Sequence, residues 1–308
     1  MLRAIASGKD KQVDAIAQVI AHVDADVLVL GDIDYDHGSI ALSALAKRIG
    51  GYPHHFARAP NRGLQSGYDL NGDDRFGRPS DAWGYGEFTG QGGLAVLSKH
   101  PIGEVVDFSA ALWRAQEDAL VLPDAPPEHP LSTTAHWEVP VLLPDGQRVT
   151  LLTWHATAPV FDGPEDRNGR RNHDEAAFWL HRIKDTQPQN LVIAGFANLD
   201  PIDGDGRPAA LDALLAHPAL TDPRPASEGA VLAGAVDTTH RGLAKLDTVD
   251  WPTEGPGNLR VDYVLPSSDL QVTDAGVFWP TPDQLLGDEV VAASRHRMVW
   301  VDIRVPDR

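Results

Sequence analysis

The sequence has no cysteine among its 308 residues. Disulfide scaffolds, thiolate metal sites and cysteine nucleophiles are therefore excluded together. No apolar run approaches the ~18 residues that a membrane-spanning helix needs. The first residues, MLRAIASGKDKQ, also lack the apolar core and small-residue cleavage site of a signal peptide. The missing cysteines are compatible with an exported protein, so they favour an extracytoplasmic location without establishing the compartment.

Basic residues are in the minority, with 26 Lys and Arg against 44 Asp and Glu, for a formal net charge of −18. Unselective binding to nucleic acid is driven by counterion release around Lys and Arg, so this charge argues against long nucleic acid as a partner. A bound divalent cation can still bring a phosphate ester to an acidic protein. The charge therefore excludes one kind of substrate and leaves phosphate chemistry open.

Apolar periodicity and turn residues predict a single α/β domain over residues 1–308. A helix is expected over 10–23 with Asp10 as its N-cap, and a second one from about Ser39, a candidate cap, to Ile49. The region 50–92 is rich in Gly, Asn, Asp and Arg, which indicates an organised functional loop. Further helices are expected over 173–183 and 209–216, and strands over 26–31, 93–98, 134–143, 148–157, 191–195, 260–265, 270–278 and 298–305.

Polar side chains stand at the ends of several of these apolar strands, and one histidine directly precedes the last strand. Polar residues at strand ends can converge on one rim of a sheet, where a rigid framework supports a site. The segments are VLVLGDIDYD (27–36), LLTWHAT (151–157), LVIAGFANLDP (191–201), RVDYVLP (260–266) and AASRHRMVWVD (292–302).

In order and spacing, these segments resemble the motifs of the endonuclease/exonuclease/phosphatase family of DNase I-like, metal-dependent phosphoesterases. The resemblance implies an α/β (α+β) fold in four layers, with two packed mixed β-sheets flanked by helices. It also implies hydrolysis of a phosphate ester by water that Mg²⁺ or Mn²⁺ activates. The matching stretches are Gly31-Asp32, Gly92-Gly-Leu-Ala-Val-Leu-Ser98, Thr153-Trp-His155, Gly195-Phe-Ala-Asn198, Arg260-Val-Asp-Tyr263 and Ser294-Arg-His296.

The same resemblance assigns expected roles to individual residues. Asp32 would be the carboxylate that holds the metal, with Asp34 beside it, because hard cations prefer carboxylate oxygens. The side chains expected to act on the phosphate are His155, Asn198 and His296, the last oriented by Asp262. Three structural alternatives stay open: a strand-end turn at Asp32, a partly buried structural His155, and a purely structural bridge between Asp262 and His296.

The sequence departs from the family pattern at three places. Phe196 stands where the family has the Asp that helps to orient or deprotonate the attacking water, and a phenyl ring can do neither. Arg295 replaces the Asp that precedes the last His. The strand that comes before the first helix in the family has no counterpart here. The carboxylates that could replace the missing one are Asp34, Asp36 and Asp200.

Two loops suggest further binding sites. The segment 158–172 is dense in Arg and Asn, and Arg forks suit phosphate oxygens, although three acidic residues in the loop could neutralise them instead. Candidate substrate-binding residues are Arg167, Asn168, Arg171 and Arg295. In the second loop Asp69, Asn71 and Asp73 have the spacing of a calcium loop without its bidentate Glu. A structural Ca²⁺ and an unmetallated Asp/Asn turn are the two interpretations.

Three functions are consistent with these observations. The first is a divalent-metal-dependent phosphoesterase that acts on a small or organic phosphate ester. The second is a catalytically degenerate relative that binds a phosphorylated or anionic ligand. This interpretation is favoured if Phe196 lies in the pocket and no other carboxylate takes the place of the missing Asp. The third is a nuclease whose basic groove is confined to residues 158–171. The sequence leaves the oligomeric state undetermined.

Overall fold

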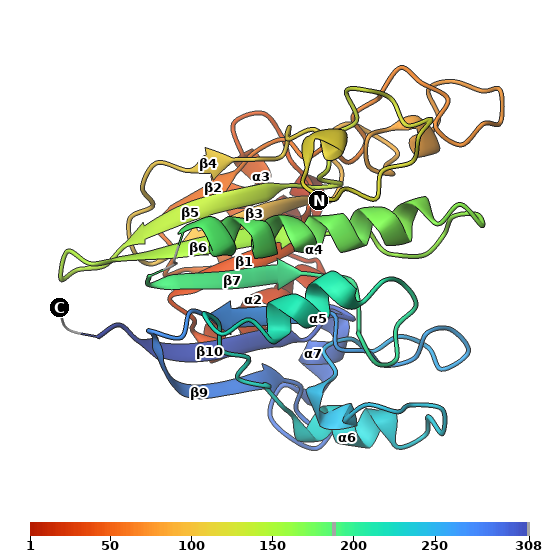
Figure 1. Ribbon diagram of the computed structural model, residues 1–308. Coiled ribbons are helices and arrows are strands. Elements are labelled where there is room, and N and C mark those ends of the chain that lie inside the picture. Colours follow the sequence, from red (N-terminus) through yellow and green to blue (C-terminus); the bar gives the residue numbers. More distant parts are fainter. Residues whose placement is uncertain (187–188, 307–308) are drawn as a thin grey trace.

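A five-stranded mixed sheet forms the centre of the computed structural model, which describes residues 1–186 and 189–306 (Figure 1). Its strand order is β4-β5-β6-β7-β8, in which β6 and β7 are parallel and the other neighbours are antiparallel. The predicted strands over 134–143, 148–157, 191–195 and 260–265 are confirmed here. The bounds are β4 (Val106–Asp107), β5 (His136–Leu142), β6 (Arg148–His155), β7 (Leu191–Phe196) and β8 (Asp262–Pro266).

A second β layer packs against this sheet and consists of two antiparallel pieces. One piece has the order β1-β3-β2, and the other is the pair β10-β9. The strand β2 lies inside the region where the sequence predicts only an organised loop. The bounds are β1 (Val27–Ile33), β2 (His54–Ala57), β3 (Gly93–Ser98), β9 (Gln271–Phe278) and β10 (Met298–Arg304).

Helices cover the outer faces of both β layers, which gives the expected four-layer α/β fold. In Figure 1 α4 lies across the face of β5, β6 and β7, and α2 and α3 lie on the far side of the molecule. The bounds are α1 (Leu2–Ser7), α2 (Lys11–Val23), α3 (Ile40–Ile49), α4 (Arg167–Thr186), α5 (Ala209–Leu215), α6 (Glu228–Gly234) and α7 (Gly287–Ala293). Short 3₁₀ turns occupy Pro79–Asp81, Trp113–Ala115 and Ala244–Leu246. No helix in the described ranges is long and apolar enough to cross a membrane.

Three apolar clusters hold the four layers together, because each interface removes nonpolar surface from water. Between α4 and the five-stranded sheet lie Leu152, Trp179 and Ile193. Between the two β layers lie Val96, Trp137 and Val192. Between α2, α3 and the second β layer lie Ile20, Leu28, Leu42 and Leu97.

The helices α2 and α3 begin where the sequence predicts, but only α2 has the predicted cap, and the short α1 before them is not predicted. Asp10 accepts a hydrogen bond from the backbone N–H of Val13 at 3.1 Å, so the cap of α2 is confirmed. Ser39 has a left-handed backbone (φ 53°) and makes no side-chain cap bond. The carboxylate of Asp36 accepts from the N–H of Ala41 at 3.1 Å in its place.

The prediction for α4 is wrong at its start, because the helix begins at Arg167 and not at His173. Its first turn is fixed by polar contacts: the carboxylate of Asp162 accepts from the N–H of Asn168 at 2.5 Å. Arg171 and Asn172 are buried polar residues in this turn. Because helix prediction rests on apolar periodicity, a first turn with buried polar residues reads as a loop.

A groove of about 800 Å³ separates the two pieces of the second β layer. Val29 of β1 and Val301 of β10 lie on its two sides, and Val192 of β7 lies in its floor. Among the described residues β1 pairs only with β3, and β10 pairs only with β9. The two strands that border the groove therefore each have one edge without a strand partner.

Candidate active site

The predicted rim of polar strand ends exists, and the register of the five-stranded sheet builds it. His155 is the last residue of β6 and lies opposite Phe196, the last residue of β7. Phe196 in turn lies opposite Asp262, the first residue of the antiparallel β8. His296 precedes β10 and forms an isolated bridge with Val249. Three adjacent strands and one loop thus bring these side chains to the same edge.

His296 and Asp262 form a hydrogen-bonded pair at this edge. The Nδ1 atom of His296 lies 3.0 and 2.9 Å from the two carboxylate oxygens of Asp262, whose side chain is buried. Burial lowers the pKa of His296, but the charge of Asp262 and the hydrogen bond outweigh it and raise the pKa above its ordinary value. The pair favours an imidazolium whose Nε2 remains available to a ligand.

His155 is buried and has the opposite electrostatic character. Burial lowers the pKa of His155 to about 4, although the carboxylate of Asp32 pulls in the other direction. The imidazole is therefore neutral at pH 7. Its Nδ1 atom is buried and has no hydrogen-bond partner within the part of the chain that the structure describes.

Phe196 lies between the two histidines. Its ring centroid is 4.9 Å from that of His155 and 5.9 Å from that of His296. The ring also packs on the backbone of β1, since a Cβ on Gly31 would lie 2.9 Å from two of its carbons. An aromatic ring thus fills the space between the groups that the family resemblance assigns to the phosphate.

Asp32 is turned out of β1 by a bulge. The register of β1 against β3 shifts between Leu30 and Ile33, and Asp32 has a left-handed backbone (φ 54°). One carboxylate oxygen pairs with Nη1 of Arg62. Desolvation raises the pKa of Asp32, but the Coulombic interaction with the imidazole of His155 and the charge and hydrogen bond of Arg62 outweigh it, so the pKa lies below its ordinary value.

Sequence reasoning missed Arg62. It lies in the irregular region between β2 and β3, where no periodicity or motif separates one arginine from the others. Only the fold brings it to the end of β1. Its proximity to Asp32 carries no signal in the sequence, because the two residues are 30 positions apart.

Asn198 directly follows β7 and has a left-handed backbone (φ 52°). Its amide nitrogen donates to the carbonyl of Ala156 at 2.7 Å. This bond holds the side chain of Asn198 beside the end of β6. Asn adopts this conformation more readily than most non-glycine residues.

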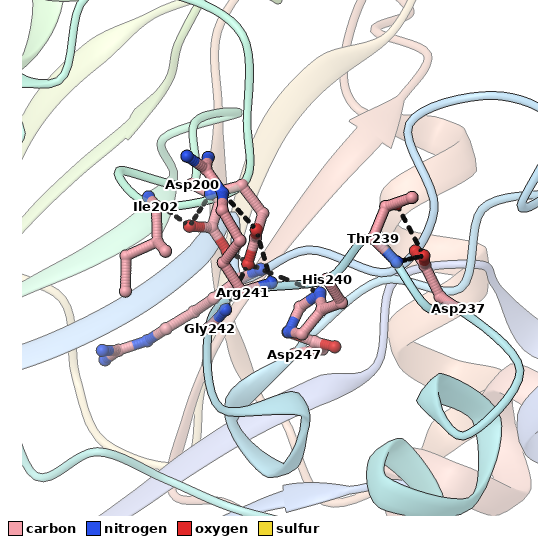
Figure 2. Close-up of polar contacts among 10 residues, drawn as sticks. Asp200, Ile202, Asp237, Thr239, His240, Arg241, Gly242 and Asp247 are labelled. Atoms are coloured by element: carbon pink, nitrogen blue, oxygen red, sulfur yellow. Dashed lines mark hydrogen bonds and ion pairs between the residues drawn. The ribbon is translucent and has the colours of Figure 1, made fainter.

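None of the three carboxylates considered as replacements reaches the position of Phe196. Asp34 accepts from the N–H of Gly92 at 3.1 Å, and Asp36 caps α3. Asp200 accepts from the N–H of Arg260 at 2.8 Å and faces a separate cluster (Figure 2). Phe196 is therefore not compensated by any of them.

The residues present do not fit the divalent cation of the family. Hard cations take several oxygen ligands, whereas the two carboxylates at this edge are already paired, Asp32 with Arg62 and Asp262 with His296. No group of three or more His, Asp or Glu within the described ranges could hold a metal ion. The expected catalytic Mg²⁺ or Mn²⁺ thus lacks a matching donor set.

Most of the predicted anion-binding residues are used elsewhere. The guanidinium of Arg171 is buried and donates to the backbone carbonyls of residues 130, 131 and 132 at 2.7–3.0 Å. Arg167 donates to the carbonyl of Leu70, and Asn168 to that of Val160. Arg295 is exposed and donates to a backbone carbonyl beside His296. The structure brings only Arg295 near the rim.

The predicted calcium loop is a network of Asp/Asn turns. Asp69 accepts from the N–H groups of Gly72, Asp73 and Asp74 at 2.7–3.2 Å. Asn71 accepts from the N–H of Asp73 at 3.3 Å, and Asp73 from that of Arg75 at 2.9 Å. These side chains satisfy the amides of their own loop, as the unmetallated alternative requires.

A second polar cluster surrounds Asp247, which is buried in the loops behind the rim (Figure 2). One oxygen of Asp247 lies 3.7 Å from Nε2 of His240, whose Nδ1 lies 3.4 Å from Asp203. Desolvation raises the pKa of Asp247 to about 8, and the neighbouring carboxylates of Asp200, Asp203 and Asp237 add to the rise. The side chain is therefore largely protonated at pH 7.

The fold is the one that the sequence resemblance implies, and the comparison with known families agrees. The chain belongs to the Endonuclease/Exonuclease/phosphatase family, whose model matches residues 3–296. No curated protein matches the chain.

Solved structures of the same family share the fold. An endonuclease/exonuclease/phosphatase from Beutenbergia cavernae DSM 12333 has 18% identity and a TM-score of 0.61, covering 96% of this chain and 66% of that one. A 3′ phosphatase from Neisseria bound to a product DNA hairpin has 16% identity and a TM-score of 0.52, covering 95% and 94%. A mannosyl-6-phosphatase from Bacteroides thetaiotaomicron VPI-5482 has 13% identity and a TM-score of 0.50, covering 96% and 91%.

Asp262→Asn tests the cause of the histidine pKa. The substitution removes the charge that raises the pKa of His296, so the pKa falls and the imidazolium is lost at a lower pH. Titration of the imidazole Cε1–H resonance by NMR measures the change. Asp302→Asn, an exposed carboxylate near the far end of β10, removes the same charge as a control. An unchanged pKa in Asp262→Asn would contradict the assigned cause.

Asp247→Asn tests the second cluster. The native carboxyl holds its proton up to about pH 8, whereas the unfolded one, at its ordinary value of 3.8, releases it. The free energy of unfolding therefore falls as pH rises from about 4 to about 8. Asn cannot ionise, so the fall in Tm between about pH 5 and about pH 9 shrinks by at least about 2 °C. Asp212→Asn, at an exposed position on α5, leaves the fall in Tm unchanged. Equal dependence of Tm on pH in the two variants would contradict the inference.

Proposed function

We propose that this protein binds the phosphate group of a small phosphate ester at the rim and hydrolyses it at most slowly. The observation that carries the proposal is the position of Phe196 between His155 and His296, with no carboxylate in its place. Hydrolysis by the family route needs a group that orients or deprotonates water. A phenyl ring supplies neither a proton acceptor nor a metal ligand.

The donors at the rim support phosphate as the ligand. His296 favours its charged form, and its Nδ1 is committed to Asp262, which leaves Nε2 for a phosphate oxygen. Asn198 adds an amide side chain beside the same edge. The mannosyl-6-phosphatase among the structural relatives supports a small phosphate monoester, whereas the 3′ phosphatase from Neisseria binds a DNA hairpin. The net charge of −18 supports the same choice.

A metal-dependent phosphoesterase is the second candidate. The hydrogen-bonded pair of His296 and Asp262 and the position of Asn198 after β7 are the observations that favour it, because both match the residues that the family resemblance assigns to the phosphate. On this alternative Asp32 releases Arg62 and binds the cation despite the ring of Phe196. The two candidates differ in one measurable quantity, the rate of turnover with metal.

Phe196→Asp separates the candidates. The wild-type protein is expected to bind inorganic phosphate in titration calorimetry, yet to turn over p-nitrophenyl phosphate and bis-p-nitrophenyl phosphate near background with Mg²⁺, Mn²⁺, Ca²⁺ or EDTA. The substitution places a carboxylate at the position where the family has one, so Mg²⁺- or Mn²⁺-dependent turnover rises by at least about tenfold.

Phe196→Asn is the matched control, because it has the size of the Asp variant without its charge. Thermal unfolding of both variants verifies that they are folded. Rapid wild-type turnover that EDTA abolishes would refute the proposal in favour of the second candidate. Equal gains in the Asn and Asp variants would assign the effect to space rather than to the carboxylate.

A further inference from the structure

Arg62 occupies a fixed position at the centre of the rim. Its Nη1 pairs with one oxygen of Asp32 and donates to the carbonyl of Gly92 at 3.2 Å. The N–H of the next residue, Gly63, donates to the carbonyl of Gly84 at 2.8 Å, which ties this segment to the loop that follows it. Arg62 is thus held in place both by the backbone of its segment and by the contacts of its guanidinium.

Gly92 makes room for this guanidinium. A Cβ at Gly92 would lie 2.5 Å from Nη1 of Arg62 and 3.0 Å from the carboxylate of Asp32. The backbone of Gly92 also has φ +56°, a conformation that side chains rarely adopt. The space for the guanidinium of Arg62 therefore depends on a glycine at position 92.

Arg62 still has donors to offer. Its side chain is 24% exposed, and within the described residues only Nη1 among its nitrogen atoms has a hydrogen-bond partner. Its charge also acts on His155, whose pKa it helps to lower. Nε and Nη2 can thus donate hydrogen bonds to a ligand.

A divalent cation would compete with this arrangement. It would have to displace the guanidinium from Asp32 and would be repelled by the positive charge of Arg62. The carboxylate of Asp262, opposite Phe196, is already paired with His296. The guanidinium needs no further ligands, and its planar fork matches two phosphate oxygens.

We infer that Arg62 supplies the fixed positive charge of this site and holds the phosphate oxygens directly, so that ligand binding does not depend on a metal ion. The inference rests on the proposed function, since it assigns the residue that holds the phosphate. It makes Arg62 a binding residue, with Asp32 as the group that positions it. The ligand class is a phosphate monoester or inorganic phosphate.

Titration calorimetry with inorganic phosphate tests the inference on the full chain. The wild-type Kd is expected to agree within about threefold in EDTA and in excess Mg²⁺, because no cation takes part. Arg62→Gln weakens binding by at least about tenfold under both conditions, since a charge-assisted hydrogen bond is lost. Arg62→Lys, which keeps the charge but not the fork, gives an intermediate affinity.

Arg58→Gln is the matched control. It removes the same charge from the same segment, but Arg58 is 52% exposed and pairs with Asp107 at 3.3 Å. Its phosphate affinity stays at the wild-type value, and thermal unfolding shows that all variants are folded.

The outcomes separate the inference from the proposed function. Binding that appears only with Mg²⁺, or an Arg62→Gln affinity equal to that of the wild type, would overturn the role of Arg62 while leaving the proposed function intact. No phosphate binding by the wild type under either condition would refute the proposed function, and the inference with it.

Discussion

The contact between Phe196 and Gly31 is the constraint on which the rest of the site depends. The two β layers meet there through an aromatic ring that lies against bare backbone, and no side chain on Gly31 could share the space. Beside this contact β1 has its bulge, which turns Asp32 toward Arg62. The same ring keeps the two histidines apart. One packing interaction therefore sets the shape of the centre.

Charges around this ring are arranged in pairs. Arg62 is matched with Asp32, and His296 with Asp262, while the buried His155 is neutral. Pairing lowers the cost of holding charged groups away from water and fixes their orientation before a ligand arrives. It also leaves free donor atoms on the positive partners. Such a site suits an oxyanion better than it suits a cation.

The sequence predicted much of the framework and part of the site. Strands such as 93–98 and the cap at Asp10 follow from local pattern, and the strand-end position of His155 follows from register. The direction of individual side chains does not. Asp34 and Asp36 accept hydrogen bonds from backbone amides, and Arg171 is buried in the polar first turn of α4. These outcomes depend on tertiary contacts, which leave no periodic pattern in the sequence. The same holds for the position of Arg62 beside Asp32.

The groove between β1 and β10 has a consequence for how the chain behaves among other polypeptides. Edge strands present rows of backbone donors and acceptors that can template pairing with another extended segment. Here two such edges border one cavity above an apolar floor that includes Val192 and Ala194. An added strand would find hydrogen-bonding partners on both flanks and nonpolar cover beneath it, which is the geometry of β-augmentation.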